Sequence, residues 1–313
     1  MIGNGIRGGM QSLLRRLAIA ASLWLIVGPG VCEPVRQPPG ELIDIGGYRL
    51  HLHCIGDGGP VVVLDSGLGG ASSDWRKVQP ALATTNRTCI YDRAGYGWSD
   101  SGPLPRTSAR IAAELRTVLM LADLPPPFVL VGHSFGGYNA RMFAGLFPRE
   151  TAGLVLVDTP HEAQADALFQ YGILGAIDPQ GRLRSLLSPD LLSALPAEVE
   201  ALAELLGPQG RTWYAMLNEA AAFDGSGEEV GATELPPDLP VGMLMHGHRI
   251  FPEGSVGDRL EHEWLQAQRD LAAEQRRSLF VIAEDSGHFI PADQPELIVK
   301  AVRWVIDELA AAP

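Results

Sequence analysis

A serine with the surroundings of a nucleophile lies near the middle of the chain. Ser134 stands between Gly132 and Gly136 in the sequence Gly-His-Ser-Phe-Gly, after an apolar run and before the helix-compatible segment Tyr138–Phe147. A serine on a sharp strand-to-helix turn needs neighbours without side chains, because helix and strand approach each other closely there. The turn lifts the hydroxyl clear of the sheet, where the next backbone N–H, from Phe135, can point at a developing oxyanion. The pattern predicts a nucleophile elbow.

The predicted nucleophile needs a base, because a serine hydroxyl is weakly reactive on its own. The chain has eight histidines, and His288 is the one expected in the loop between the last strand and the last helix. That loop lies near the same carboxyl edge of the sheet as Ser134. We therefore expect His288 to be the general base.

The elements that position these residues alternate between apolar strands and helices, which predicts a mostly parallel, doubly wound α/β sheet. The expected strands are Glu41–Ile45, Tyr48–Cys54, Pro60–Leu64, Arg87–Tyr91, 129–133, Gly153–Val157, Val241–Met245 and Ser278–Ile282. The expected helices are Trp75–Ala83, Thr107–Ala122, Tyr138–Phe147, Gly257–Ala273 and Gln294–Leu309.

The alternation stops after the sixth strand, and residues 161–239 are predicted to form a helical cap over the carboxyl ends of the strands. The expected cap helices are Leu168–Leu174, Leu187–Leu206 and Thr212–Ala222, followed by an acidic, proline-rich return loop over Gly225–Pro240. Residues 41–160 and 240–313 then form the core around the cap.

The N-terminus has the pattern of a secretory signal peptide. Arg15 and Arg16 precede the apolar run Leu17–Val27, which is too short to span a bilayer comfortably. We assign residues 1–32 to a cleaved signal peptide, with a retained membrane anchor as the alternative, and residues 33–40 to a linker. The sequence thus predicts an exported protein, periplasmic or secreted.

Composition excludes some partners. The chain has 313 residues, of which 46% are hydrophobic and 19% charged, and this suits one large globular domain with an insertion. Its formal net charge of −13 argues against nucleic acid and anionic membrane surfaces as partners. Contact with a membrane is expected only if the N-terminal segment is retained.

Several other polar residues are expected to be structural. His51 and His53 share one face of a predicted hairpin, but no third ligand is nearby, so we expect solvent-facing histidines rather than a metal site. Asp92 and Arg93 are expected to brace a loop, and His133 to pack beside the site.

In these features the chain resembles the α/β-hydrolases, from Glu41 to Leu309. The matching segments are Asp-Ser-Gly-Leu-Gly-Gly at 65–70, Asp-Arg-Ala-Gly-Tyr-Gly-Trp-Ser-Asp at 92–100, the serine elbow, and Gly-His at 287–288. The family's loop after the third strand usually reads His-Gly-x-x-Gly, and here Ser66 replaces that histidine. The resemblance implies an oxyanion hole made by the backbone N–H groups of Leu68 and Phe135, which the replacement does not remove.

The acid of the family's triad is less clear in this chain. Many members place it soon after the seventh strand, where Ile250 stands here; the other family position, directly after the sixth strand, holds Asp158. A buried carboxylate needs a partner, and the N–H of a catalytic histidine is a good one. Asp158 is therefore favoured, with Glu253 as the alternative and Asp258 or Asp285 after it. A cap of the turn that follows is the structural alternative for Asp158.

The chain has three cysteines, Cys32, Cys54 and Cys89. Export would permit a disulfide between the last two, and buried thiols are the alternative. The resemblance implies that the second and fourth strands are neighbours, which brings Cys54 and Cys89 onto adjacent strands.

The expected activity is hydrolysis of small to medium, apolar carboxylic esters through an acyl-enzyme, with no metal or organic cofactor. An amidase or peptidase and a carbon–carbon hydrolase use the same residues and remain alternatives. Epoxide- and halide-cleaving relatives usually carry Asp at the elbow, so Ser134 argues against them. A non-catalytic binding protein that keeps the fold is the alternative from another class.

Overall fold

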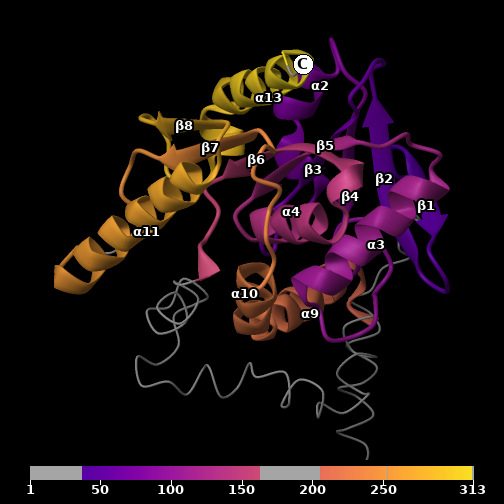
Figure 1. The fold of residues 1–313 in the computed structure, drawn as a ribbon. Coiled ribbons are helices and arrows are strands. Elements are labelled where there is room, and N and C mark those ends of the chain that lie inside the picture. Colours follow the sequence, from indigo (N-terminus) through magenta and orange to yellow (C-terminus); the bar gives the residue numbers. More distant parts are fainter. Residues whose placement is uncertain (1–36, 163–204, 252, 312–313) are drawn as a thin grey trace, which may run out of the picture. The chain divides into compact units, whose positions relative to one another are not determined.

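The computed structural model describes residues 37–162, 205–251 and 253–311. Within them, eight strands form one sheet in the order β1-β2-β4-β3-β5-β6-β7-β8 (Figure 1). Their bounds are β1 Glu41–Asp44, β2 Arg49–Ile55, β3 Val62–Asp65, β4 Thr88–Asp92, β5 Phe128–His133, β6 Thr151–Val157, β7 Val241–His246 and β8 Ser278–Ala283. Strand β2 is antiparallel to both of its neighbours, and all other pairs are parallel. The predicted doubly wound sheet is confirmed.

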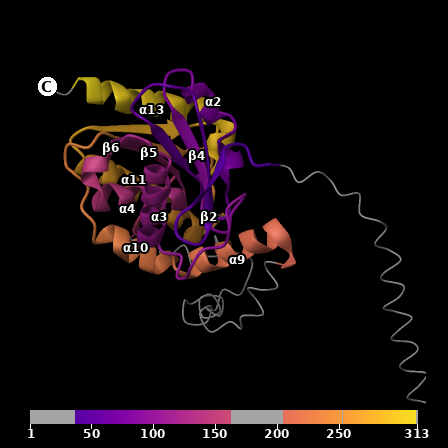
Figure 2. The same ribbon diagram turned by 90° about the vertical axis from the view of Figure 1, so that its right-hand side faces the viewer.

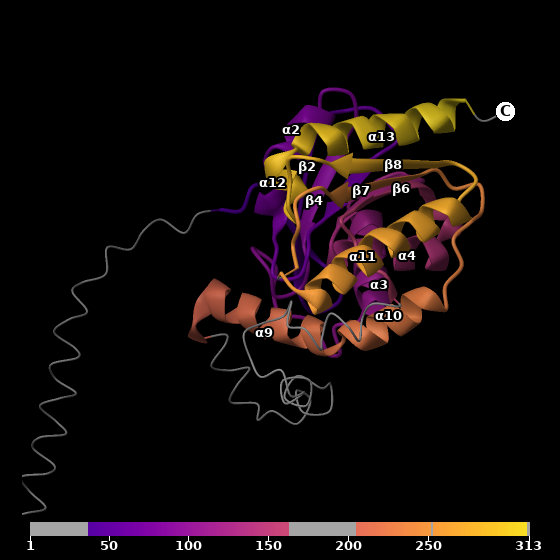
Figure 3. The same ribbon diagram turned by 90° about the vertical axis from the view of Figure 1, so that its left-hand side faces the viewer.

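Helices cover both faces of the sheet, which explains why the central strands are apolar throughout. In Figure 1, α2 and α13 lie above the sheet, while α3, α4 and α11 lie below it, and Figure 3 shows the same layers from the side. The helices are α2 Val78–Leu82, α3 Ser108–Leu121, α4 Phe135–Leu146, α11 Ser255–Glu274, α12 Ile290–Asp293 and α13 Pro295–Ala310, with short 3₁₀ turns at Ser72–Trp75 and Pro148–Glu150. Every residue of β5 and β6 is buried between these layers.

Two further helices, α9 (Gly207–Ala221) and α10 (Phe223–Gly231), lie at the far side of α3 and α4 from the sheet (Figure 2). Helix α9 reaches the loop after β4, where a Cβ on Gly95 would lie 2.5 Å from the Ala215 methyl carbon. Two predicted cap helices lie outside the described residues: Leu168–Leu174 entirely, and Leu187–Leu206 up to residue 204.

The predicted loop over Gly225–Pro240 is wrong at its start, because α10 extends to Gly231. Three glycines and three acidic residues give α10 a weak helix propensity. Tertiary contacts override it: Phe223 and Val230 are buried, and Ser226 accepts a hydrogen bond from the Ser108 N–H at 3.0 Å. Packing against α3 and α4 therefore makes the helix.

His51 does not face solvent, contrary to the prediction from the hairpin pattern. Its side chain is fully buried, and Nδ1 lies 2.8 Å from Oδ2 of Asp92. The strand is not an exposed hairpin arm, because β2 is paired on both sides and the loop carrying Ser99 covers it. Asp92 also accepts backbone hydrogen bonds from Ser72 and Trp98, so it braces a loop as expected.

Cys54 and Cys89 stand opposite each other on β2 and β4 and are joined by a disulfide. The pairing that the family resemblance implied is thus present. The predicted N-terminal segment, residues 1–32, lies outside the described residues. Among the residues that are described, no helix has the length and apolar character needed to cross a membrane.

Candidate active site

The serine elbow is a strained turn between β5 and α4. Ser134 has φ 52° and ψ −124°, a conformation that residues with side chains rarely adopt, and its N–H donates to the Val157 carbonyl at 2.9 Å. A Cβ on Gly132 would lie 2.3 Å from the Gly136 carbonyl oxygen, and one on Gly136 would lie 2.4 Å from the Asp65 oxygen. The glycines are therefore required by close backbone approach, as the sequence predicted.

The Ser134 side chain lies next to the loop after β3. It makes no capping hydrogen bond to α4, whose first residue is the buried Phe135. A helix leaves its first N–H groups without helical partners, and they favour negative charge. The loop after β3 runs close by, because a Cβ on Gly67 would lie 3.1 Å from the Ser134 Cβ. The N–H groups of Leu68 and Phe135 thus belong to the two segments that flank the serine.

His288 and Asp158 are hydrogen-bonded across the carboxyl edge of the sheet. His288 lies between β8 and α12, its side chain is 26% exposed, and Nδ1 is 2.6 Å from Oδ2 of the fully buried Asp158. Asp158 follows β6 with φ 46°, and its N–H donates to the Leu244 carbonyl at 2.7 Å. A carboxylate on Nδ1 fixes the tautomer in which Nε2 is free to accept a proton.

The other carboxylates considered from the sequence lie elsewhere. Glu253 and Asp285 are exposed, and Asp258 pairs with Arg249 at 2.6 Å. In the described residues, Asp158 is the one of these four carboxylates with a hydrogen bond to His288.

Asp158 is surrounded by hydrogen-bond donors. Besides His288, its Oδ1 accepts from Nδ1 of His246 at 2.7 Å, from the His246 backbone N–H at 3.3 Å and from Nε1 of Trp264 at 3.1 Å. Burial alone would raise the pKa of Asp158, but the hydrogen bonds from His246 and His288 outweigh it and hold that pKa well below the usual range. The carboxylate stays ionised.

Sequence reasoning missed His246, Trp264 and the third member of this group, Glu261. Glu261 lies on α11, and its Oε1 is 2.7 Å from Nε2 of His246. One signal could have pointed to the group: His246 ends β7, close to the position where many relatives of this fold type carry their acid. A polar residue that ends a buried strand at the catalytic edge needs an explanation.

His133, in the variable position of the elbow, packs beside the site as predicted. Its ring lies 4.8 Å from that of His288, and Nε2 donates to the His288 carbonyl at 2.8 Å. Burial, helped by the nearby His288, lowers the pKa of His133 to about 3, so the ring is neutral. A Cβ on Gly67 would lie 3.1 Å from its Nδ1. His133 thus connects the elbow, the loop after β3 and the loop that carries His288.

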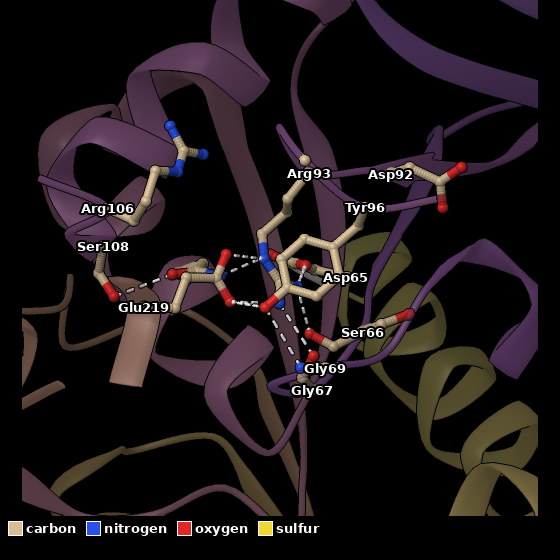
Figure 4. Close-up of polar contacts among 12 residues, drawn as sticks. Asp65, Ser66, Gly67, Gly69, Asp92, Arg93, Tyr96, Arg106, Ser108 and Glu219 are labelled. Carbon is tan, nitrogen blue, oxygen red and sulfur yellow. Dashed lines mark hydrogen bonds and ion pairs between the residues drawn. The ribbon is translucent and has the colours of Figure 1, made fainter. Parts of the chain in front are cut away.

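Arg93 supports the loop after β3 from inside the protein (Figure 4). Its Nη1 donates to Oδ1 of Asp65 at 2.7 Å and to the Ser66 carbonyl at 2.5 Å, and Nη2 donates to the Gly67 carbonyl at 2.9 Å. Figure 4 shows Asp92, its neighbour in the chain, pointing away from this cluster. Arg93 therefore braces the loop that carries Leu68, as expected.

The same guanidinium connects this loop to α9. Nε and Nη2 of Arg93 each donate to Glu219 at 2.8 Å, and both side chains are buried. Tyr96 donates to Glu219 at 2.8 Å and accepts from the Gly69 N–H at 3.3 Å (Figure 4). Burial and the charge of Glu219 raise the pKa of Tyr96 well above its usual value, so its hydroxyl remains a donor. Glu219 was not predicted from the sequence.

Within the part of the chain that the structure describes, no three His, Cys, Asp or Glu side chains are grouped so that they could hold a metal ion. The chemistry available at this edge of the sheet is that of a serine hydroxyl, a histidine held by a carboxylate, and backbone N–H groups. That set can transfer an acyl group to water.

A model of the alpha/beta hydrolase family matches residues 61–301, and the chain belongs to this family. It is 28% identical to an AB hydrolase superfamily protein of Gibberella zeae, over 79% of this chain and 86% of that protein. It is 31% identical to the uncharacterized protein YqjL of Bacillus subtilis, over 86% of this chain and 93% of the relative.

Solved structures share the fold. A thermophilic esterase from Thermogutta terrifontis superposes with a TM-score of 0.58 at 24% identity, covering 84% of this chain and 94% of the esterase. An enol-lactonase from Burkholderia xenovorans LB400 superposes with a TM-score of 0.55 at 17% identity, covering 86% and 100%. These likenesses, together with the family match, identify the fold as that of an alpha/beta hydrolase.

Proposed function

We propose that this protein is a serine hydrolase that cleaves small to medium, apolar carboxylic esters. Ser134 is the nucleophile, His288 the general base and Asp158 the acid that orients it. The observation that carries the proposal is the 2.6 Å contact between His288 and the buried, ionised Asp158. His133, the residue before Ser134 on the strained elbow, packs against His288 with ring centroids 4.8 Å apart. Strain and a buried charge are costly to maintain, and they persist where function uses them.

We infer the following reaction from these proposed roles. Nε2 of His288 takes the proton from the Ser134 hydroxyl as Oγ attacks the ester carbonyl. The N–H groups of Leu68 and Phe135 stabilise the tetrahedral oxyanion, and His288 then protonates the departing alcohol. A water molecule, deprotonated by His288, attacks the acyl-enzyme and releases the carboxylic acid. Asp158 stabilises the imidazolium in both steps without taking its proton.

The apolar substrate class rests on the surroundings of the loop after β3. Helix α9 places Met216 over this loop, and a Cβ on Gly69 would lie 3.1 Å from the Met216 sulfur. Leu68, which belongs to this loop, is partly buried against the apolar core. A thioether and aliphatic side chains favour an acyl group without charge. Two of the solved structures that share the fold are named an esterase and an enol-lactonase, and these names are consistent with an ester substrate here.

We also propose that the protein is exported, as its N-terminal pattern predicts. The disulfide between Cys54 and Cys89 supports this location, because disulfides persist in oxidising compartments.

The test is a panel of p-nitrophenyl esters, from acetate to decanoate, hydrolysed by the wild type, Ser134→Ala and the exposed-serine control Ser73→Ala. We expect turnover of the shorter apolar esters, a loss of about 10³-fold or more in Ser134→Ala, and no change in the control. Equal rates in Ser134→Ala and the wild type would exclude Ser134 as the nucleophile. Hydrolysis of p-nitroanilides but not of esters would move the substrate class to amides.

A further inference from the structure

His246 is a buried histidine with a carboxylate at each ring nitrogen. It ends β7, and 1% of its surface is exposed. Nδ1 lies 2.7 Å from Oδ1 of Asp158, and Nε2 lies 2.7 Å from Oε1 of Glu261 on α11. Four side chains therefore form a continuous chain in the order Glu261, His246, Asp158, His288.

This geometry favours a doubly protonated ring. A neutral imidazole has one N–H, so one of its nitrogens would turn a lone pair toward a carboxylate oxygen. An imidazolium donates at both nitrogens. Burial disfavours the charged ring, but the hydrogen bonds and charges of Asp158 and Glu261 outweigh burial and raise the pKa of His246. The electrostatics therefore agree with the distances.

The groups around His246 leave it no other charged partner among the described residues. Asp158 faces it from the loop after β6, Glu261 faces it from α11, and His288 lies behind Asp158. Trp264 packs against both histidine rings, with centroids 6.2 Å from His246 and 6.3 Å from His288. The indole Nε1 also donates to Oδ1 of Asp158.

Glu261 is itself held in place. Its second oxygen, Oε2, accepts the backbone N–H groups of Ile250 and Phe251 at 3.2 and 3.3 Å. Ile250 stands at the position where many family members carry the triad acid. In this chain the loop after β7 thus anchors the carboxylate that holds His246, instead of supplying the acid itself.

We propose that His246 is a positioning residue of the hydrolase site: as an imidazolium it holds Oδ1 of Asp158, turns Oδ2 toward His288, and offsets part of the negative charge that His288 faces. The catalytic consequence rests on the proposed function, because it assumes that His288 is the base. The charge state of His246 and its coupling to His288 do not depend on the proposed function.

The sign of the coupling is fixed by Coulomb's law. A positive His246 opposes a second positive charge on His288 across the shared carboxylate. Replacing His246 by asparagine keeps an N–H donor near the Nδ1 position but removes the charge. The pH midpoint at which His288 takes up its proton should then rise by about one unit, since the two rings are separated by one carboxylate in a buried site.

The experiment is a pH titration of the full chain labelled with ¹⁵N-histidine, followed by long-range ¹H–¹⁵N spectra. We expect one histidine to keep both ring protons to a higher pH than an unperturbed imidazole does, and its signal to be absent in His246→Asn. The signal absent in His288→Asn should titrate about one pH unit higher in His246→Asn than in the wild type. The control is His262→Asn, an exposed histidine on α11, which should change neither result.

Two results would overturn the inference: a neutral His246 at pH 7, or an unchanged His288 midpoint in a folded His246→Asn protein. If His246→Asn does not fold, Glu261→Gln replaces it, with the exposed Glu263→Gln as its control. Glu261→Gln should lower the midpoint of His246 itself, because it removes one of two carboxylates. A midpoint unchanged by Glu261→Gln would also overturn the inference.

The same titration separates this inference from the proposed function. In the ester assay, the acid side of the pH profile of kcat/KM should shift to higher pH by about one unit in His246→Asn. A purely structural role would lower kcat and leave the pH of this midpoint unchanged. If the spectra are as expected but no ester or amide is hydrolysed, the proposed function fails and the charge state of His246 stands. If esters are hydrolysed but His246 is neutral, only this inference fails.

Discussion

Two buried groups of charges flank Ser134, and they are built from different chemistry. Arg93 supports the loop after β3 with a guanidinium that stays protonated at any pH at which the protein is folded. The group that includes His288 contains two imidazole rings, those of His246 and His288, whose charges depend on pH. The first group is a fixed support for main chain, and we propose that the second sets the protonation of His288. One site therefore uses permanent and titratable charge for separate tasks.

The two groups also differ in what they hold. Arg93 uses all five of its N–H groups, on two carboxylates and on the carbonyls of Ser66 and Gly67. His246 binds side-chain oxygens through its ring. A change at Arg93 should therefore disturb the backbone and the stability of the fold, whereas a change at His246 should mainly alter pH dependence.

The largest expected effect comes from the carboxylate that the second group holds. Asp158→Asn should lower kcat by about 10⁴-fold, because the amide favours the wrong tautomer of His288. Steady-state kinetics on p-nitrophenyl esters measure it, with the exposed Asp57→Asn as the control. Near-normal activity in Asp158→Asn, with a loss in Glu253→Gln, would instead make Glu253 the acid.

Breaking the first group should cost stability. Arg93→Ala leaves Asp65 and Glu219 buried without their cation, and we expect the free energy of unfolding to fall by about 3–5 kcal/mol. Urea unfolding measures this loss, and the exposed Arg87→Ala should be neutral. Arg93→Lys should recover only part of it, since lysine lacks the planar fork. A loss below about 1 kcal/mol for Arg93→Ala would contradict the assigned role.

Glu219→Gln tests the link between α9 and the loop after β3. It keeps an oxygen for Arg93 but places an amide where Tyr96 and Arg93 both donate. We expect kcat to fall by about tenfold as the Leu68 N–H loses its position, with a smaller change in KM. Unchanged kcat in a variant with lowered stability would show that the link serves the fold alone.

The smallest effect concerns stability and pH in the second group. The folded pKa of His246 is raised, so its charged contacts contribute fully below its unfolded pKa of about 6.5 and are lost as pH rises through the folded value. The stability cost of His246→Asn should therefore be smaller at pH 10 than at pH 6. Urea unfolding at the two pH values measures it, and a cost independent of pH would imply a neutral ring.

What the sequence could predict was local. The elbow depends on neighbouring residues, and the position of Asp158 follows from its place at the end of an apolar strand. The links that join the site across the fold had no such pattern: Glu219 lies 126 residues from Arg93, and Glu261 lies 15 from His246 on a different element. A long-range ion pair leaves no periodic signal in the sequence. Glu219 and Glu261 therefore could not be told apart from solvent-exposed acidic residues.

The errors in secondary structure have the same origin. Helix α10 forms from a glycine-rich, acidic segment because Phe223 and Val230 pack against neighbouring helices. His51 is buried because β2 gains a second partner strand and a covering loop. In both places, contacts distant in sequence override a local preference.

Whether Ser134 is an activated nucleophile can be decided by the intact mass of the protein after exposure to a fluorophosphonate, compared with that of Ser134→Ala. The reagent reacts with an activated serine and needs no knowledge of the substrate. We expect one stoichiometric adduct on the wild type and none on Ser134→Ala. A folded wild-type protein without an adduct, or an equal adduct on the variant, would contradict the assignment of Ser134 as the nucleophile.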